Sequence, residues 1–228
     1  YCKEYGCDPV GLISLTETGM YFGSNIAQLL GLRFPSKEIL VGVRDKYQMR
    51  KLFSEHGLPT VSFSEVFSVE EAYKVAEEIG YPVVIKPRLA GGSLYIRRID
   101  NPITLHDCFD EYLECGINVV SGDPMVGQTA RSVIIEKLIE GVTLFDTNLD
   151  LPVGEVSVEG FVIEGRVCVL GHHDKPLPSN GPYYEEVLWS TPTRLPFNLI
   201  SELNDLAERT VKAVKLDNSF FHIEARTT

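Results

Sequence analysis

The chain has 228 residues, 44% of them hydrophobic, which is enough for the core of one large domain or two small ones. Its formal net charge of −11 at pH 7 argues against nucleic acid or an anionic membrane as the main partner. The five cysteines form no CxxC pair, which favours reduced thiols over a disulfide framework or a zinc site. Because the sequence also shows no apolar run of membrane-spanning length and no signal segment, we expect a cytoplasmic protein.

The first part of the chain has the pattern of a partial α/β unit. Residues 1–6 resemble the end of a helix, and residues 10–15 predict a buried strand. Residues 23–30 predict a helix that ends at Gly31. This abrupt beginning leads us to expect further chain before Tyr1.

Two helices are predicted next. Residues 45–56 predict a helix on which Lys46, Arg50 and Lys51 recur at helical spacing. The segment 68–71 resembles a capping box and opens a second, amphipathic helix, which ends at a glycine.

The most informative segment follows, where a buried strand leads to one lysine and a glycine-rich turn. The β-branched run Val83–Ile85 ends at Lys86, which should therefore lie where solvent or an anion can satisfy its charge. Gly91 and Gly92 allow the backbone to turn its N–H groups toward a ligand, and Ser93 adds a hydroxyl donor. This combination is suited to binding a polyphosphate, with an ordinary hairpin turn as the alternative interpretation of the glycines.

The rest of the chain predicts helices and mostly antiparallel strands, including two strands that pair across the turn Glu164-Gly165. The predicted ranges are 102–115 and 199–215 for helices, and 133–136, 155–163, 166–170 and 220–224 for strands. This order of elements predicts an α+β fold with a partial α/β unit in front.

Charged residues at the ends of these elements suit nucleotide chemistry. Lys46 and Lys86 are suited to phosphates, because developing phosphoryl charge needs cations around it. Glu136 and Glu155 are suited to the adenine side and the ribose. Glu224 is suited to Mg²⁺, a hard ion that prefers oxygen ligands. Since the chain contains neither GxxxxGK[ST] nor GxGxxG, a nucleotide fold other than the P-loop and Rossmann folds is implied.

Several segments together resemble the ATP-grasp family of enzymes, and the resemblance extends over nearly the whole chain. Asp45-Lys46, followed by Arg50, is similar to the segment with the family's first ATP lysine, and residues 84–87 to the segment with its second. Residues 88–93 resemble the glycine-rich loop that closes over the phosphates.

The resemblance also assigns roles in the second half of the chain. Residues 154–160 are similar to the ribose-contacting strand, which favours Glu155 over Glu159 as the ribose ligand. His222-Ile223-Glu224 resembles the segment with the first metal-binding glutamate. The segment that resembles the adenine-contacting hinge consists of Glu136, Lys137, Leu138 and Ile139.

Within this superfamily, residues 173–175, 181–182 and 191–193 resemble the carboxylate–amine ligases of the bacilysin-type L-amino acid ligase group. The resemblance implies that ATP phosphorylates the carboxylate of one amino acid and that the amine of a second attacks the acyl phosphate, with release of ADP and phosphate. It implies ATP and Mg²⁺ as cofactors, with Mn²⁺ as an alternative metal, and it is compatible with a homodimer.

Three residues are predicted to be catalytic. Lys86 would neutralise the phosphates, and His173 would line the acceptor pocket, with a loop hydrogen bond as its alternative role. Arg226 would share a strand face with Glu224 and approach phosphate, with plain surface charge as the alternative.

The resemblance divides the chain into a partial pre-ATP-grasp α/β unit (1–43), a small lid subdomain (44–131) and a large subdomain (132–228). It also implies a second metal-binding glutamate and a substrate-binding arginine beyond Thr228, so we expect the described site to be incomplete. The alternative functions are another ATP-grasp enzyme, of the carboxylase or purine-biosynthesis type, and a non-catalytic nucleotide-binding module.

Overall fold

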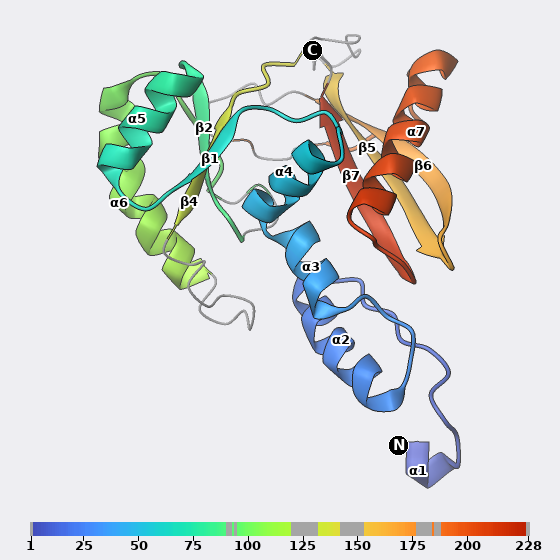
Figure 1. The fold of residues 1–228 in the computed structure, drawn as a ribbon. Helices are drawn as coiled ribbons and strands as arrows, with labels where there is room; N and C mark the ends of the chain where they lie inside the picture. The colour runs from blue at the N-terminus through green and yellow to red at the C-terminus, as the bar shows by residue number, and fades with distance from the viewer. Residues whose placement is uncertain are drawn as a thin grey trace.

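The computed structural model describes residues 2–89, 93, 95–119, 132–141, 153–176, 184 and 188–226. Within these ranges the named strands form two antiparallel sheets, and helices cover the outer side of each sheet (Figure 1). The structure therefore confirms the predicted α+β class. None of the helices in these ranges is both long and apolar enough to cross a lipid bilayer.

The N-terminal helices α1 (Cys2–Tyr5), α2 (Glu17–Leu30) and α3 (Lys37–Arg44) extend away from the two sheets (Figure 1). The predicted buried strand at residues 10–15 is wrong, because this segment forms no strand and Val10 is 98% exposed. A strand needs a neighbour to satisfy its backbone, and none of the described strands pairs with this segment.

Helix α4 (Lys46–Glu55) confirms the helix predicted at residues 45–56. Asp45 closes α3 and begins α4, because its side-chain Oδ1 accepts hydrogen bonds from the N–H groups of Tyr47 (3.0 Å) and Gln48 (3.3 Å). A carboxylate at this position satisfies backbone donors that have no partner within the helix. Lys46 is consequently fixed at the first position of α4.

The first sheet has the strand order β1-β4-β2-β3, with β4 between strands that precede it in the sequence. Its strands are β1 (Phe63–Val66), β2 (Val83–Pro87), β3 (Arg97–Ile99) and β4 (Val133–Lys137). Helices α5 (Val69–Ile79) and α6 (Pro102–Val119) cover its outer face, where a buried core includes Val66, Val83, Ile85, Leu105 and Phe109. Since β4 pairs with β1 and β2, this sheet crosses the predicted boundary between residues 131 and 132. The division into domains stays a prediction.

The second sheet has the order β6-β5-β7, with helix α7 (Phe197–Ala213) on its outer face. Strands β5 (Val153–Ile163) and β6 (Arg166–Pro176) form the predicted hairpin, and β7 (Ser219–Arg226) pairs with the other edge of β5. The turn residues Glu164 and Gly165 both have positive φ (52° and 72°), which suits the twist of a tight hairpin. The core beneath α7 includes Val158, Val162, Val211 and Phe221.

Gly160, in the middle of β5, allows the Phe221 ring to reach this core. The two residues are direct cross-strand partners, and a Cβ atom at position 160 would lie 2.2 Å from Phe221 Cζ and 2.5 Å from the carbonyl oxygen of Cys168. One of these contacts is to backbone, so a side chain here could be accommodated only if a strand moved.

We predict that Gly160→Ala lowers the free energy of unfolding by about 1–3 kcal/mol, measured by urea denaturation. The matched control is Gly171→Ala in β6, where a Cβ atom would meet nothing within 4 Å. Equal stability of the two variants would contradict the steric role of Gly160.

Candidate functional site

The inner faces of the two sheets carry the charged residues predicted from the sequence. In Figure 1, α5 and α6 lie on the outer side of the first sheet and α7 on the outer side of the second, with α4 between the sheets. A direct contact joins the two parts, since Arg226 Nη1 on β7 donates to the carbonyl oxygen of Ile139, just after β4 (3.1 Å).

On the first sheet, Glu136 is buried between two cations. Lys86 Nζ donates to Glu136 Oε2 (2.6 Å), and Arg50 donates to both carboxylate oxygens (2.9 and 3.1 Å). The side chains of Lys86, Glu136 and Arg50 are only 11%, 5% and 16% exposed. Because two basic side chains share one carboxylate, Glu136 can neutralise only one of them when both are protonated. The predicted anion for Lys86 is therefore present, and it is a protein carboxylate.

This pairing changes the ionisation of both partners. Burial raises the pKa of Glu136, but Lys86 and Arg50 outweigh it and lower the pKa to about 2. Burial lowers the pKa of Lys86, and the attraction of Glu136 opposes this shift. Glu136 is thus buried and bound at both carboxylate oxygens, rather than solvated at the end of its strand.

On the second sheet, charged side chains form cross-strand rows on the face opposite α7. Glu155 on β5 lies between Lys175 on β6 and Arg226 on β7, and the next row places Ser157 between His173 and Glu224. The third row has Glu159 beside His222. Glu155 and Glu159 share this face because the strand register is continuous between them.

Lys175, which was not predicted as a site residue, lies at the centre of this face. Its side chain is only 3% exposed, and its Nζ donates to Glu155 Oε1 (2.8 Å) and to Glu224 Oε1. Burial lowers the pKa of Lys175, but the hydrogen bonds to the two glutamates outweigh it and raise the pKa above its ordinary value. Arg226 Nε donates to the other oxygen of Glu155 (2.6 Å). The face is thus a network of alternating charge.

Glu159 connects the two histidines of this face. Its Oε1 lies 2.7 Å from His222 Nδ1 and 3.3 Å from His173 Nδ1. The Trp189 ring stacks on His222, with centroids 5.3 Å apart and planes at 8°. His172, by contrast, bonds to Asn204 on α7 (2.8 Å), so the adjacent histidines point to opposite faces of the sheet.

Glu224 is the predicted metal ligand, and it offers carboxylate oxygen to a hard cation. Its side chain is 43% exposed. Burial raises the pKa of Glu224, but hydrogen bonds from His222 and Lys175 outweigh it and lower the pKa to about 2, so the carboxylate is ionised. The described residues contain no group of three or more acidic, histidine or cysteine side chains arranged to hold a metal ion. Glu224 therefore fits Mg²⁺ as one ligand of a larger set.

The other residues predicted for the site differ in their surroundings. Lys137 Nζ donates to the carbonyl oxygen of Gly80 (2.8 Å), and the adjacent Leu138 is buried. Ser93 has a positive φ of 55°. Gly91 and Gly92 lie outside the described residues, as do residues 181–182. The roles of Lys137, Leu138, Gly91, Gly92 and Ser93 in nucleotide binding stay predictions.

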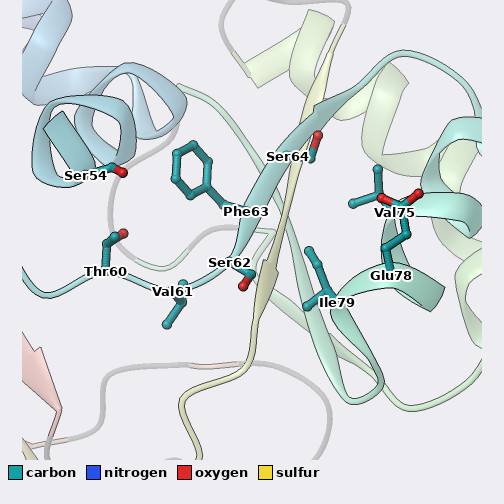
Figure 2. Close-up of a pocket in the computed structure, with 9 residues that line it drawn as sticks. All are labelled: Ser54, Thr60, Val61, Ser62, Phe63, Ser64, Val75, Glu78 and Ile79. Carbon is teal, nitrogen blue, oxygen red and sulfur yellow. The ribbon is translucent and has the colours of Figure 1, made fainter.

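A separate hollow of about 580 Å³ opens between α4, β1 and α5 (Figure 2). It is lined by Ser54, Thr60, Val61, Ser62, Phe63, Ser64, Val75, Glu78 and Ile79. None of these is a predicted site residue, and Glu78 is the one side chain of the set that is charged at neutral pH. The hollow therefore contains no predicted site residue, although its Phe63 is the cross-strand partner of Glu136.

Comparison with known proteins identifies the class. Residues 79–228 match the family profile described as an ATP-grasp domain, and the chain belongs to this family. Alanine–anticapsin ligase of Bacillus subtilis is 26% identical over 200 residues, which are 86% of this chain and 41% of that protein. The carbamoyl phosphate synthase large chain of Thermotoga neapolitana is 28% identical over 190 residues, covering 82% of this chain and 15% of that one. The chain thus spans less than half the length of these relatives.

Solved structures confirm the predicted ATP-grasp fold. The L-amino acid ligase from Bacillus licheniformis superposes with a TM-score of 0.78 at 22% identity, over 99% of this chain and 49% of that one. A biotin carboxylase domain from Hydrogenobacter thermophilus, solved with MgADP and bicarbonate, gives 0.73 at 20% identity, over 98% and 46%. The resemblance to carboxylate–amine ligases is also confirmed, since two such ligases are among these matches.

We predict that Glu136 makes stability dependent on pH at acidic values. The pKa of Glu136 is about 2 in the folded chain, compared with an ordinary value of 4.5 that applies to the unfolded chain. The unfolded state therefore takes up a proton first as the pH falls. The contribution, at most about 3 kcal/mol, is complete above about pH 5 and is lost as the pH drops toward 2. Urea unfolding of wild type and Glu136→Gln from about pH 3 to pH 7 measures it.

Glu136→Gln should be less stable at neutral pH, and its stability should vary less below about pH 5. The control is Glu140→Gln, at a carboxylate 70% exposed that lies shortly after β4, which should keep the wild-type profile. Parallel pH profiles for wild type and Glu136→Gln would show that the ion pair does not produce the effect.

Proposed function

We propose that the protein is an ATP-dependent carboxylate–amine ligase that joins amino acids through an acyl phosphate and releases ADP and phosphate. The observation that carries this proposal is the pair of charged inner faces in an ATP-grasp chain: two basic side chains, Lys86 and Arg50, around one carboxylate, and a carboxylate-bearing face around Glu224. The similarity to alanine–anticapsin ligase supports amino acids as the substrate class.

In this proposal, the first sheet binds the phosphates of ATP. Lys86 and Arg50 share one carboxylate, so a phosphate oxygen would meet the remaining positive charge in a largely water-excluded setting. Lys46 begins the neighbouring helix α4, and a helix N-terminus also favours negative charge. The hinge residues 136–139 and Glu155 are proposed to contact adenine and ribose.

The second sheet would hold the metal and the acceptor side. Glu224 is proposed as one Mg²⁺ ligand, with Mn²⁺ as an alternative ion, and the metal would neutralise charge on the phosphate groups. Hydrogen bonds from His222 and Lys175 keep this carboxylate ionised, and the contact with Lys175 holds it in place. His173, positioned through its Nδ1 by Glu159, is proposed to line the acceptor pocket. Arg226 is proposed to approach the transferred phosphoryl group.

The proposed reaction has two steps. A carboxylate oxygen of one amino acid attacks the γ-phosphorus of ATP, and ADP leaves. The amine nitrogen of the second amino acid then attacks the acyl carbon, the C–O bond to phosphate breaks, and the nitrogen loses a proton. Phosphorylation is needed because a free carboxylate has no adequate leaving group, whereas the acyl phosphate expels phosphate.

A second candidate is another ATP-grasp activity, of the carboxylase or purine-biosynthesis type. The match to the carbamoyl phosphate synthase large chain favours it, because its 28% identity is comparable to that of the ligase. The activating substrate separates the two candidates, since bicarbonate would stimulate ATP consumption in a carboxylase. A non-catalytic nucleotide-binding module would bind ATP without turnover.

We further propose a cytoplasmic location, where ATP is supplied and thiols stay reduced. The free thiols of Cys7, Cys108 and Cys168 agree with such a compartment. A homodimer is proposed by analogy with the relative whose structure is a biotin carboxylase domain dimer.

We predict that the protein converts ATP to ADP and phosphate only when Mg²⁺ and amino acids are both present, as followed by phosphorus NMR. Lys86→Met should abolish this conversion, while Lys51→Met, at an exposed lysine of α4, should retain it. Formation of AMP and pyrophosphate, or turnover without amino acids, would exclude the ligase. Stimulation by bicarbonate would favour the second candidate.

Metal removal tests the role of Glu224. EDTA should abolish ADP formation, and Mg²⁺ or Mn²⁺ should restore it. Glu224→Gln should require about tenfold more Mg²⁺ for half-maximal rate, because a neutral amide binds a hard dication less well. Glu164→Gln, in the exposed β5–β6 turn, is the control. Identical Mg²⁺ titrations for the two variants would remove Glu224 from the metal site.

A further inference from the structure

Arg88, one residue after β2, is a buried cation that the proposed function does not use. The residue is only 6% exposed. Its guanidinium binds two carboxylates, Asp45 and Glu65, and its Nη1 also donates to Ser132 Oγ (3.4 Å). Such a buried, multiply bonded arginine has a fixed orientation, because its planar group must satisfy several partners at once.

Two donors of the Arg88 guanidinium bind the two carboxylate oxygens of Asp45. Arg88 Nε donates to Asp45 Oδ1 (3.0 Å), and Nη2 donates to Oδ2. The same Oδ1 accepts the N–H groups of Tyr47 and Gln48 that begin α4. The guanidinium also lies over the Tyr47 ring, 5.3 Å from its centroid. Arg88 therefore holds the carboxylate that caps α4.

The main chain of Arg88 makes a second connection to the same place. Its carbonyl oxygen accepts the N–H of Lys46 (3.0 Å). Since Arg88 follows Lys86 by two residues, one short segment joins the end of β2 to the first residue of α4. The two lysines assigned to phosphate binding are thereby held in a fixed relation to each other.

We propose that Arg88 is a positioning residue for nucleotide binding, which holds Lys46 and Lys86 at a set separation by fixing the N-terminus of α4 to the end of β2 through Asp45. This inference rests on the proposed function, because it assumes that both lysines face the phosphates of one nucleotide. It assigns no contact between Arg88 and the nucleotide.

The two carboxylates that bind Arg88 provide a matched comparison. Asp45 connects the guanidinium to α4, whereas Glu65 connects it to β1, at the edge of the first sheet. Asp45→Asn and Glu65→Gln each replace one of the two carboxylates that neutralise Arg88 by a neutral amide, so both should reduce stability. Asparagine is also a good N-cap, so Asp45→Asn keeps α4 capped while it weakens the connection to Arg88.

The test measures MgADP binding by isothermal titration calorimetry and unfolding by urea, for the wild type and both variants. Asp45→Asn should weaken MgADP binding about tenfold, while Glu65→Gln should leave it within about twofold of wild type. Arg88→Lys keeps the positive charge but loses the fork, so it should behave like Asp45→Asn, and it serves as the second variant if Asp45→Asn does not fold.

The outcomes separate the two proposals. If wild type does not bind MgADP, the proposed function fails and this inference fails with it. If wild type binds MgADP and Asp45→Asn binds as tightly as Glu65→Gln, the positioning role is overturned while the proposed function stands. Equal weakening by both variants, in proportion to lost stability, would reduce Arg88 to a structural residue.

Discussion

The arrangement of this protein depends on the neutralisation of a lysine that its own strand buries. Strand β2 is buried along its whole length, with Val83 and Ile85 in the hydrophobic core, and Lys86 belongs to the same strand. An ammonium group in such a place must be paired or lose its charge. Glu136, on the adjacent strand β4, supplies the negative charge. Because the same carboxylate binds Arg50, it also fixes α4 against the inner face of the sheet.

The second sheet meets the same constraint in another way. There, acidic and basic side chains lie beside one another on three strands, and Glu155 has a basic neighbour on each side. Lys175 is the central member, bound to Glu155 and Glu224 at once. A network of this kind keeps Glu224 ionised, as its proposed role as a metal ligand requires.

Local signals in the sequence predicted the parts of the fold that local chemistry decides. The capping segment at residues 68–71, the hairpin turn at 164–165 and the strand that leads to Lys86 could all be recognised from adjacent residues. The strand expected at residues 10–15 failed because a strand depends on a partner that its own sequence does not specify.

The partners of the charged residues were also beyond prediction from local pattern. Arg88 binds Asp45, which precedes it by 43 positions, and Lys175 binds Glu224, which follows it by 49. Only the folded chain brings these groups together. Family resemblance supplied candidate roles for single residues, whereas the networks that orient them, including Trp189 against His222, came from tertiary structure alone.

The central position of β4 in the first sheet also constrains the order in which the chain can fold. Residues 63–66 and 83–87 become neighbours only through a strand that is made much later, at residues 133–137. Until that strand inserts, Lys86 has no Glu136 beside it. The hydrated ammonium group of Lys86 then opposes its own burial at the centre of the sheet. Contacts so distant in sequence form slowly, so the insertion of β4 is both the topological and the electrostatic step that completes this half of the molecule.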